Sequence, residues 1–342
     1  MDKLLIASHF HFTRKEEGRG LRENVYICSM ENKKLSPLKF LPDAMEMPWG
    51  TIEYMLADLG FVDSVAIEGW LKGNTLSDIM QTYLERVVGE TAFEWYGTQF
   101  PVLVKKLDVK GRTSLHINPD DETAEQRYDA FGKTALWYVT AAGPKAKLFL
   151  GFKRPVGADE FYRACADGSV EDLLYSVTPR VGESYLITPG LVHAAADVTL
   201  LEVAESSELW FRLHDWGSQE REMHLEEAFD LINFDQYVRP SNRSKELLAA
   251  TDQFTVGQIH LTAPLESHAG IEETFLIYVC VGGAATIKAD GETFRFAAGE
   301  LVLVPAECSD FVLAPEGDAA VVLEVRMDPR ESNDIVSEPV EE

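Results

Sequence analysis

Three polar residues alternate along one short segment of the chain, Ser114, His116 and Asn118, in the run Ser-Leu-His-Ile-Asn. Side chains two residues apart on a β-strand point to the same face, so these three would form one polar row. Because a buried polar group needs a partner, a polar row on an otherwise apolar strand is typical of a pocket wall. The segment therefore predicts a pocket.

Other candidates for chemistry lie in similar strand-like blocks, with His193 and Arg212 in one block and Lys105 and Lys133 in two others. The chain has 57 acidic and 31 basic residues, which gives a net charge of −26. An anionic substrate would therefore depend on a few basic residues concentrated at its site. Lys105, Lys133 and Arg212 are the candidates for that role.

Taken in order, these blocks resemble the type I phosphomannose isomerases (mannose-6-phosphate isomerases), which belong to the cupin superfamily. The resemblance covers roughly residues 37–328, and the order and spacing of the blocks agree throughout. Several motifs in register are more specific than any one of them. The quoted blocks are FPVLVKKLDV, SLHINPDD, GKTALWYV, PGLVHAAA and WFRLHDWG.

The resemblance implies a zinc ion, but it also implies that the ion's ligands have changed. The family's four ligand positions fall here at His116, Asn118, Ala135 and His193. Zinc in proteins prefers imidazole, thiolate and carboxylate donors, and catalytic sites usually keep three protein ligands. His116 and His193 can bind zinc and Asn118 offers only an amide oxygen, whereas Ala135 offers no donor. We expect a degenerate metal site made of His116, Asn118 and His193.

By the same resemblance, several residues would act on the substrate. Lys105 would act in the catalytic pocket, Ser114 and Lys133 would lie near the phosphate, and Arg212 would stabilise an enediolate. Moving a proton between C1 and C2 also requires a base, and the resemblance leaves its identity open. The candidates are Asp120, Asp121 and His214.

Two classes of function fit these residues. The first is a sugar-phosphate isomerase that converts mannose 6-phosphate to fructose 6-phosphate with an altered metal site. The second is a catalytically inactive relative that binds a sugar phosphate or a partner protein. The basic residues and His193 favour the enzyme, whereas Asn118 and Ala135 favour the inactive relative. A third interpretation is an isomerase or epimerase for another sugar, with a site rebuilt around His116 and His193.

A repeated spacing indicates the fold. Gly182 to His193 and Gly299 to Asp310 both begin at a glycine, pass through an apolar strand and a proline, and reach a polar residue eleven positions on. This spacing is typical of a cupin barrel, a double-stranded β-helix. We expect a mainly β protein with two cupin barrels in tandem and helical insertions, and a second barrel without a metal.

The expected order along the chain begins with a β-hairpin over residues 1–36 and a first barrel over 37–249. A second barrel over 250–328 and a disordered acidic tail over 329–342 follow. Apolar periodicity predicts a helix over 75–89, which Thr75 would cap. Helices are also expected over 158–174, with a break at Asp167–Gly168, and over 221–231.

Composition excludes several classes of function. The acidic balance argues against nucleic acid or an anionic membrane as a partner, because both require a basic surface. No window approaches 18 consecutive apolar residues, so no membrane-spanning segment is expected. The four cysteines, at 28, 165, 280 and 308, have neither disulfide nor zinc-cluster spacing, which is typical of reduced thiols in the cytoplasm. The oligomeric state is left open.

Overall fold

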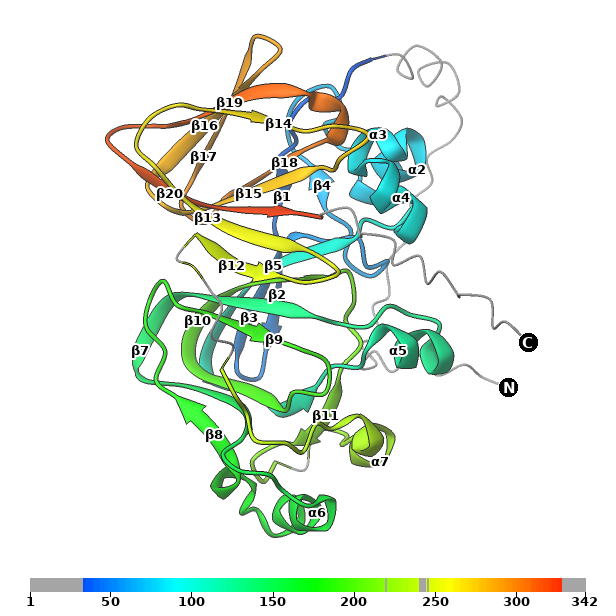
Figure 1. Cartoon of the computed structure of the whole chain (residues 1–342), viewed down its shortest axis with the longest axis vertical. Coiled ribbons are helices and arrows are strands. Elements are labelled where there is room, and N and C mark those ends of the chain that lie inside the picture. Colours follow the sequence, from blue (N-terminus) through cyan, green and yellow to red (C-terminus); the bar gives the residue numbers. More distant parts are fainter. Residues whose placement is uncertain (1–32, 219, 240–243, 245, 328–342) are drawn as a thin grey trace, which may run out of the picture.

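The chain forms two curled β structures stacked along its long axis, with helices on the outside (Figure 1). The structure is a computed structural model that describes residues 33–218, 220–239, 244 and 246–327. The mainly β, tandem cupin fold expected from the sequence is confirmed. Of the hairpin expected over 1–36 only the last four residues are described, and the tail expected over 329–342 lies outside the described residues.

The first barrel is a nine-stranded sheet in which the long strands β5, β7 and β10 form the wall. The path runs β11-β6-β10-β5-β3-β2, and β7 pairs with β10, β8 and β9. All of these pairings are antiparallel. The strands are β2 Asp43–Met47, β3 Gly50–Leu56, β5 Val102–Arg112, β6 Leu115–Ile117, β7 Ala135–Phe152, β8 Leu174–Val177, β9 Ser184–Ile187, β10 His193–Glu205 and β11 Phe211–His214.

The second barrel consists of two antiparallel sheets. One has five strands in the order β12-β13-β20-β15-β18, and the other has four in the order β14-β19-β16-β17. The strands are β12 Leu247–Ala250, β13 Thr255–Leu261, β14 Leu265–His268, β15 Leu276–Gly282, β16 Ala284–Ala289, β17 Glu292–Ala297, β18 Leu301–Val304, β19 Asp310–Pro315 and β20 Ala320–Arg326, with a 3-10 turn, η3, at Ala306–Cys308.

The helix expected over 75–89 is broken in two. Helix α2 (Leu76–Tyr83) begins at Thr75, whose side chain accepts a hydrogen bond from the Asp78 amide as predicted, and Leu84 adopts a φ of 51° before α3 (Glu85–Val88). A left-handed φ ends a helix, so the apolar stripe continues across two short helices instead of one. Helix α4 (Glu90–Tyr96), which the sequence analysis missed, follows at once.

Of the other helices, two lie at the end of the first barrel farther from the second barrel, and one lies at its side (Figure 1). The expected segment 158–174 contains α6 (Ala158–Asp167) and a 3-10 turn, η1 (Val170–Asp172), with Gly168 ending α6 in the left-handed conformation. The segment expected over 221–231 starts later than predicted. It contains α7 (Leu225–Ala228) and the 3-10 turn η2 (Phe229–Leu231), and α5 (Asp121–Tyr128) was not expected as a helix.

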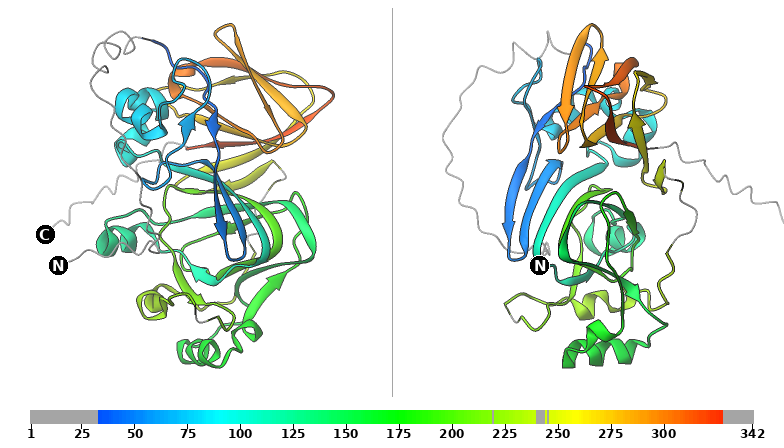
Figure 2. Two further views of the ribbon diagram at one scale, coloured as in Figure 1. Left: turned by 180° about the vertical axis from the view of Figure 1, so that it is seen from behind. Right: turned by 90° about the vertical axis from the view of Figure 1, so that its left-hand side faces the viewer.

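A shared core joins the two barrels. It contains buried residues of β3 and β5, helices α2–α4 and the strands β13, β15, β18 and β20. Phe100 and Phe275 meet within it, with ring centroids 5.0 Å apart. The short strands β1 (Phe40–Leu41) and β4 (Val65–Ala66) pair beside the second barrel, where Leu38 and Leu303 exchange backbone hydrogen bonds. In both views of Figure 2, helices α2–α4 lie beside the second barrel.

The described part of the chain holds no helix long and apolar enough to cross a membrane. Three of the cysteines, Cys165, Cys280 and Cys308, are free thiols, and Cys28 lies outside the described residues. Burial raises the pKa of the Cys165 and Cys308 thiols to about 12, which keeps both protonated at neutral pH.

Candidate functional site

Two histidines meet inside the first barrel. His116 on β6 and His193 at the start of β10 are register partners, and their ring centroids lie 4.1 Å apart. The Nδ1 atoms of His116 and His193 lie 2.9 Å from the Ser114 carbonyl and 2.7 Å from the Leu191 carbonyl, respectively. A carbonyl can only accept, so each Nδ1 carries the proton and each Nε2 keeps a lone pair. The predicted approach of the two imidazoles is confirmed.

Both imidazoles are neutral at physiological pH. Burial lowers the pKa of His193 to about 4. Burial, and then the neighbouring His193, place the pKa of His116 well below its ordinary value. A buried imidazole without a fixed anionic partner avoids the charged form because that form loses its hydration. The pair therefore offers two proton acceptors and no positive charge.

Four charged side chains converge beside the histidines: Lys105 on β5, Lys133 just before β7, Glu202 on β10 and Glu208 after β10. The Nζ atoms of both lysines lie 3.2 Å from Oε1 of Glu202. Lys105 also forms a direct ion pair with Glu208, and Lys133 Nζ lies 3.6 Å from Glu208 Oε2. The Trp137 indole donates a 2.7 Å hydrogen bond to Oε2 of Glu202. We name these four charged residues the lysine–glutamate cluster.

Lys105 and Glu202 stay ionised although they are buried. Burial alone would lower the pKa of Lys105, but the Glu202 and Glu208 carboxylates outweigh burial and raise it. Burial alone would raise the pKa of Glu202, but Lys105 and Lys133 outweigh burial and hold it well below its ordinary value. Oppositely charged neighbours at these distances favour the charged forms. The barrel interior thus keeps the charged forms of Lys105 and Glu202 in contact.

One member of the cluster has unused hydrogen-bonding capacity. Glu202 Oε1 is buried and lies 3.2 Å from the Nζ atoms of both lysines, so ion pairs already surround it. Lys133 is 4% exposed. Its ammonium group contacts the carboxylates of Glu202 and Glu208, but in the described part of the chain it forms no side-chain hydrogen bond. Buried polar groups in native proteins nearly always have hydrogen-bond partners. An ammonium group has three N–H donors, so its two carboxylate contacts leave Lys133 at least one donor for a bound ligand.

A second polar group adjoins the histidines. Arg212 is the register partner of His116, is 8% exposed, and its Nε lies 3.4 Å from Ser114 Oγ. Its Nη1 donates a 2.7 Å hydrogen bond to the Glu222 carbonyl, and the guanidinium lies 4.9 Å from the Trp210 ring centroid. These contacts hold Arg212 in place and use only two of the about five N–H donors of a guanidinium.

The three residues considered as the base lie outside the lysine–glutamate cluster. Asp120 is exposed and caps α5 by accepting a 2.8 Å hydrogen bond from the Thr123 amide. Asp121 accepts hydrogen bonds from the Gly132 amide and from Gln253, and His214 Nδ1 accepts one from the Trp216 amide. The side-chain contacts found for all three are therefore structural.

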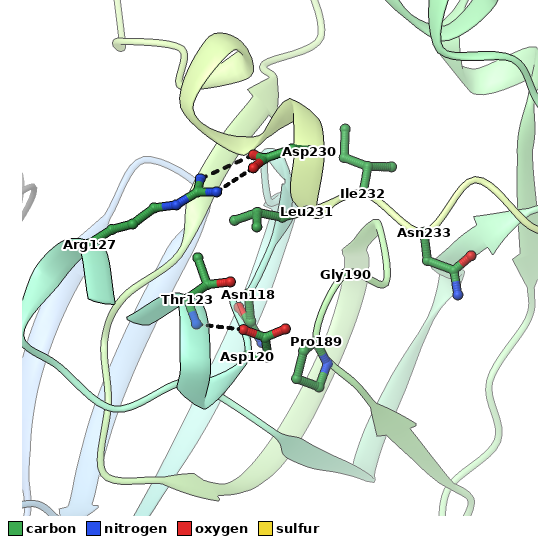
Figure 3. A pocket seen from close by; sticks show the side chains of 10 residues that line it. All are labelled: Asn118, Asp120, Thr123, Arg127, Pro189, Gly190, Asp230, Leu231, Ile232 and Asn233. Atoms are coloured by element: carbon green, nitrogen blue, oxygen red, sulfur yellow. Dashed lines mark hydrogen bonds and ion pairs between the residues drawn. The ribbon is translucent and has the colours of Figure 1, made fainter. Parts of the chain in front are cut away.

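A polar cavity of about 290 Å³ lies between α5 and η2, and an ion pair between Arg127 and Asp230 spans its rim (Figure 3). Neither histidine and no member of the lysine–glutamate cluster lines it. Its wall consists of Asn118, Asp120, Thr123, Arg127, Pro189, Gly190, Asp230, Leu231, Ile232 and Asn233.

The donor set does not match a zinc site of three or four ligands. In the described residues, no group of three or more His, Cys, Asp or Glu side chains could hold a metal ion. Ala135, at the position where the resemblance places a glutamate, is 1% exposed and has no donor atom. Asn118 lines the cavity of Figure 3, and its backbone carbonyl accepts the Gly190 amide. Only His116 and His193 remain as ordinary zinc ligands.

Sequence reasoning missed Trp137, Glu202 and Glu208. Glu202 interrupts an alternating apolar strand, between Leu200 and Ala204 on the same face, and that interruption was the available signal. A charged residue in such a position is almost never buried without a partner. Two lysines in neighbouring blocks could have been assigned as those partners.

The chain is similar to mannose-6-phosphate isomerases in both sequence and fold. Residues 244–324 match the family model "Mannose-6-phosphate isomerase, cupin domain". The mannose-6-phosphate isomerase ManA of Bacillus subtilis is 25% identical over 320 residues, which cover 84% of this chain and 98% of that protein.

Two solved structures share the fold. The crystal structure of a mannose 6-phosphate isomerase from Bacillus subtilis superposes with a TM-score of 0.74 at 22% identity, covering 85% of this chain and 100% of the other. A zinc-bound mannose 6-phosphate isomerase superposes with a TM-score of 0.70 at 14% identity, covering 86% of this chain and 100% of the other.

Proposed function

Because the chain belongs to the type I mannose-6-phosphate isomerase family of cupin proteins, we propose that it interconverts mannose 6-phosphate and fructose 6-phosphate inside the first barrel. The observation that carries the proposal is the buried lysine–glutamate cluster next to two neutral imidazoles. Burying ion pairs is costly, and replacing them with apolar residues is often neutral or stabilising. Retaining such a cluster in a barrel core favours a catalytic role over a purely structural one.

The reaction moves hydrogen between two adjacent carbons of the open-chain sugar. A base removes the proton from C2, the electron pair forms the C1=C2 double bond, and the negative charge moves onto O1. The C2 hydroxyl then passes its proton to O1, and the proton held by the base returns to C1 as the C2=O bond forms. The steps require a carboxylate or imidazole base, donors for the developing oxyanion and a cationic site for the phosphate.

Glu208 is the carboxylate we assign as the base. Its side chain is 16% exposed, compared with 7% for Glu202, so it is the more accessible of the two carboxylates. Glu202, which Trp137 and the two lysines fix in place, would hold both ammonium groups in position beside the sugar. The neutral Nε2 atoms of the two histidines would accept hydrogen bonds from other hydroxyl groups of the sugar.

We assign Arg212 and Ser114 to binding the phosphate group of the substrate. An arginine beside a serine hydroxyl offers several donors in fixed directions, as phosphate binding requires. The alternative, an inactive relative that binds a sugar phosphate or a partner protein, rests on the reduced metal ligand set. Both functions share the binding site and differ in turnover.

A coupled assay of mannose 6-phosphate conversion tests the proposal. Arg212→Ala should lower kcat/KM by about 10²–10³, and Arg212→Lys should recover only part of the loss because lysine cannot reproduce the fork of donors. Arg154→Ala, which breaks an exposed ion pair with Glu160, is the matched control and should keep full activity. An unmodified protein that binds the sugar phosphate without converting it would favour the inactive relative.

A further inference from the structure

The imidazole pair has a geometry that does not suit a shared zinc ion. Two imidazoles bound to one tetrahedral zinc at about 2.0–2.1 Å hold their ring centroids about 5 Å apart. The rings of His116 and His193 lie 4.1 Å apart at an interplanar angle of 58°. The two rings therefore pack against each other more closely than a common ligated ion would leave them.

The nearest carboxylate is not available as a third ligand. Trp137 holds one oxygen of Glu202 at 2.7 Å, and the other lies 3.2 Å from both lysine Nζ atoms. A dication bound to Glu202 would lie next to two ammonium groups in a buried region, where like charges repel strongly. The two ammonium groups beside Glu202 and the missing donor at Ala135 therefore both disfavour zinc binding at the site where the family resemblance predicts it.

The same surroundings already contain the positive charge that the reaction needs. Lys133 and Lys105 both approach one oxygen of Glu202, so their ammonium groups converge on one region of the barrel. Lys105 donates to Glu208, whereas for Lys133 the described residues provide no side-chain hydrogen bond. A buried ammonium with open donors is suited to bind an oxygen on which negative charge develops.

We propose that this chain isomerises its substrate without a bound metal ion, and that the Lys133 ammonium, supported by Lys105, stabilises the enediolate oxygen. The inference rests on the proposed function. The charge balance is simple. O1 gains negative charge when Glu208 takes the C2 proton, and the adjacent ammonium compensates it by hydrogen bonding without transferring its proton. O1 then takes the proton of the C2 hydroxyl, which moves the charge to O2, and the charge is released as the C2=O bond forms and Glu208 returns its proton to C1.

Zinc binding is measured first, independently of activity. We expect the purified protein to carry no stoichiometric zinc by elemental analysis and to show no saturable zinc binding by calorimetry. The double variant Asn118→His/Ala135→Glu restores the family's ligand types and should bind zinc stoichiometrically, and adding His193→Ala to it should abolish that binding. Stoichiometric zinc in the unmodified protein, lost on His193→Ala, would overturn the inference.

Turnover of mannose 6-phosphate is then measured on the same samples with and without a chelator. We expect the chelator to leave the rate unchanged and Lys133→Met to lower kcat by about 10²–10³, with partial recovery in Lys133→Arg. Lys147→Met, which removes an exposed ammonium paired with Glu171, should keep the full rate. Near-ultraviolet circular dichroism checks folding, and the neutral pair Lys133→Met/Glu208→Gln should fold without an uncompensated charge and stay inactive.

The possible failures are distinguishable. Activity that the chelator abolishes and zinc restores would overturn the metal-free inference while leaving the isomerase function intact. A Lys133→Met protein that is folded and fully active would overturn the role of Lys133. Absence of isomerase activity with and without zinc would overturn the proposed function, and the inference with it.

Discussion

At the scale of single residues, the electrostatic state of the site follows from a few contacts. Hydrogen bonds to backbone carbonyls fix the tautomers of His116 and His193, and burial keeps both rings neutral. Glu202 remains a carboxylate because two lysines and the Trp137 indole stabilise its charge. A neutral pair of acceptors and an ionised carboxylate therefore lie side by side at pH 7.

The lowered histidine pKa values predict acid sensitivity. Between about pH 6.5 and pH 4 the unfolded chain binds a proton at His193 that the folded chain does not, so stability falls as pH falls through that window. Each such group contributes a slope of at most about 1.4 kcal/mol per pH unit, and His116 acts in the same direction. Urea unfolding at several pH values between 7.5 and 4.5 should show this slope.

The variant His193→Gln should reduce that slope because it removes one titrating group from the core. His268→Gln, a change at a half-exposed histidine of the second barrel, is the control and should leave the slope as it is. An unchanged slope in His193→Gln would show that His193 does not keep its depressed pKa in the folded protein.

At the scale of elements, strand β10 places both His193 and Glu202 on the interior face. Nine residues separate them, so strict alternation would put them on opposite faces. The alternation reverses near Asp197, which has a φ of 49°. Ala195 before it and Val198, Leu200 and Ala204 after it all pack in the barrel interior. One residue in the left-handed region thus brings two parts of the site together.

This reversal yields a prediction at Asp197. Both Asp197→Gly and Asp197→Val remove the 2.7 Å hydrogen bond that the Asp197 carboxylate accepts from the Lys145 amide. Only valine is strained at this φ, so Asp197→Val should be less stable than Asp197→Gly by about 1–3 kcal/mol in urea unfolding. Isomerase activity should fall further in the valine variant. Equal stability and activity in the two variants would mean that this backbone conformation does not position the site.

The reversal also explains which parts of the site could be predicted from the sequence. His116 and His193 were predicted to meet because both lie in motifs whose register the resemblance supplied. Glu202 could not be placed by counting from His193, because a local backbone conformation at Asp197 decides its face. The metal ligand set of His116, Asn118 and His193 remains a prediction.

At the scale of the whole molecule, the two barrels share one hydrophobic core. The tandem β architecture was predictable because its glycine and proline spacing occurs twice along the chain. Their shared core was not, since residues of 35–104 pack against strands beyond residue 247 and such long-range contacts leave no local pattern. The break at Leu84 was not predictable either, because the apolar stripe continues from α2 into α3 across it.

The shared core predicts a single unfolding transition. Phe275→Ala removes a fully buried ring from the second barrel that contacts Phe100. The change should lower the free energy of unfolding of the whole chain by about 3–5 kcal/mol. Circular dichroism and the tryptophan fluorescence of the first barrel should report the same shifted midpoint. Separate transitions by the two probes would show that the barrels unfold independently.

The central claim, that the cluster beside the two histidines carries out the isomerisation, is tested most directly by following mannose 6-phosphate in deuterated water by nuclear magnetic resonance. The account predicts conversion to fructose 6-phosphate with solvent deuterium entering at C1, and a rate lowered by about 10²–10⁴ in Glu208→Gln, which removes the assigned base. No conversion by the unmodified protein, or an unchanged rate in folded Glu208→Gln, would contradict the account.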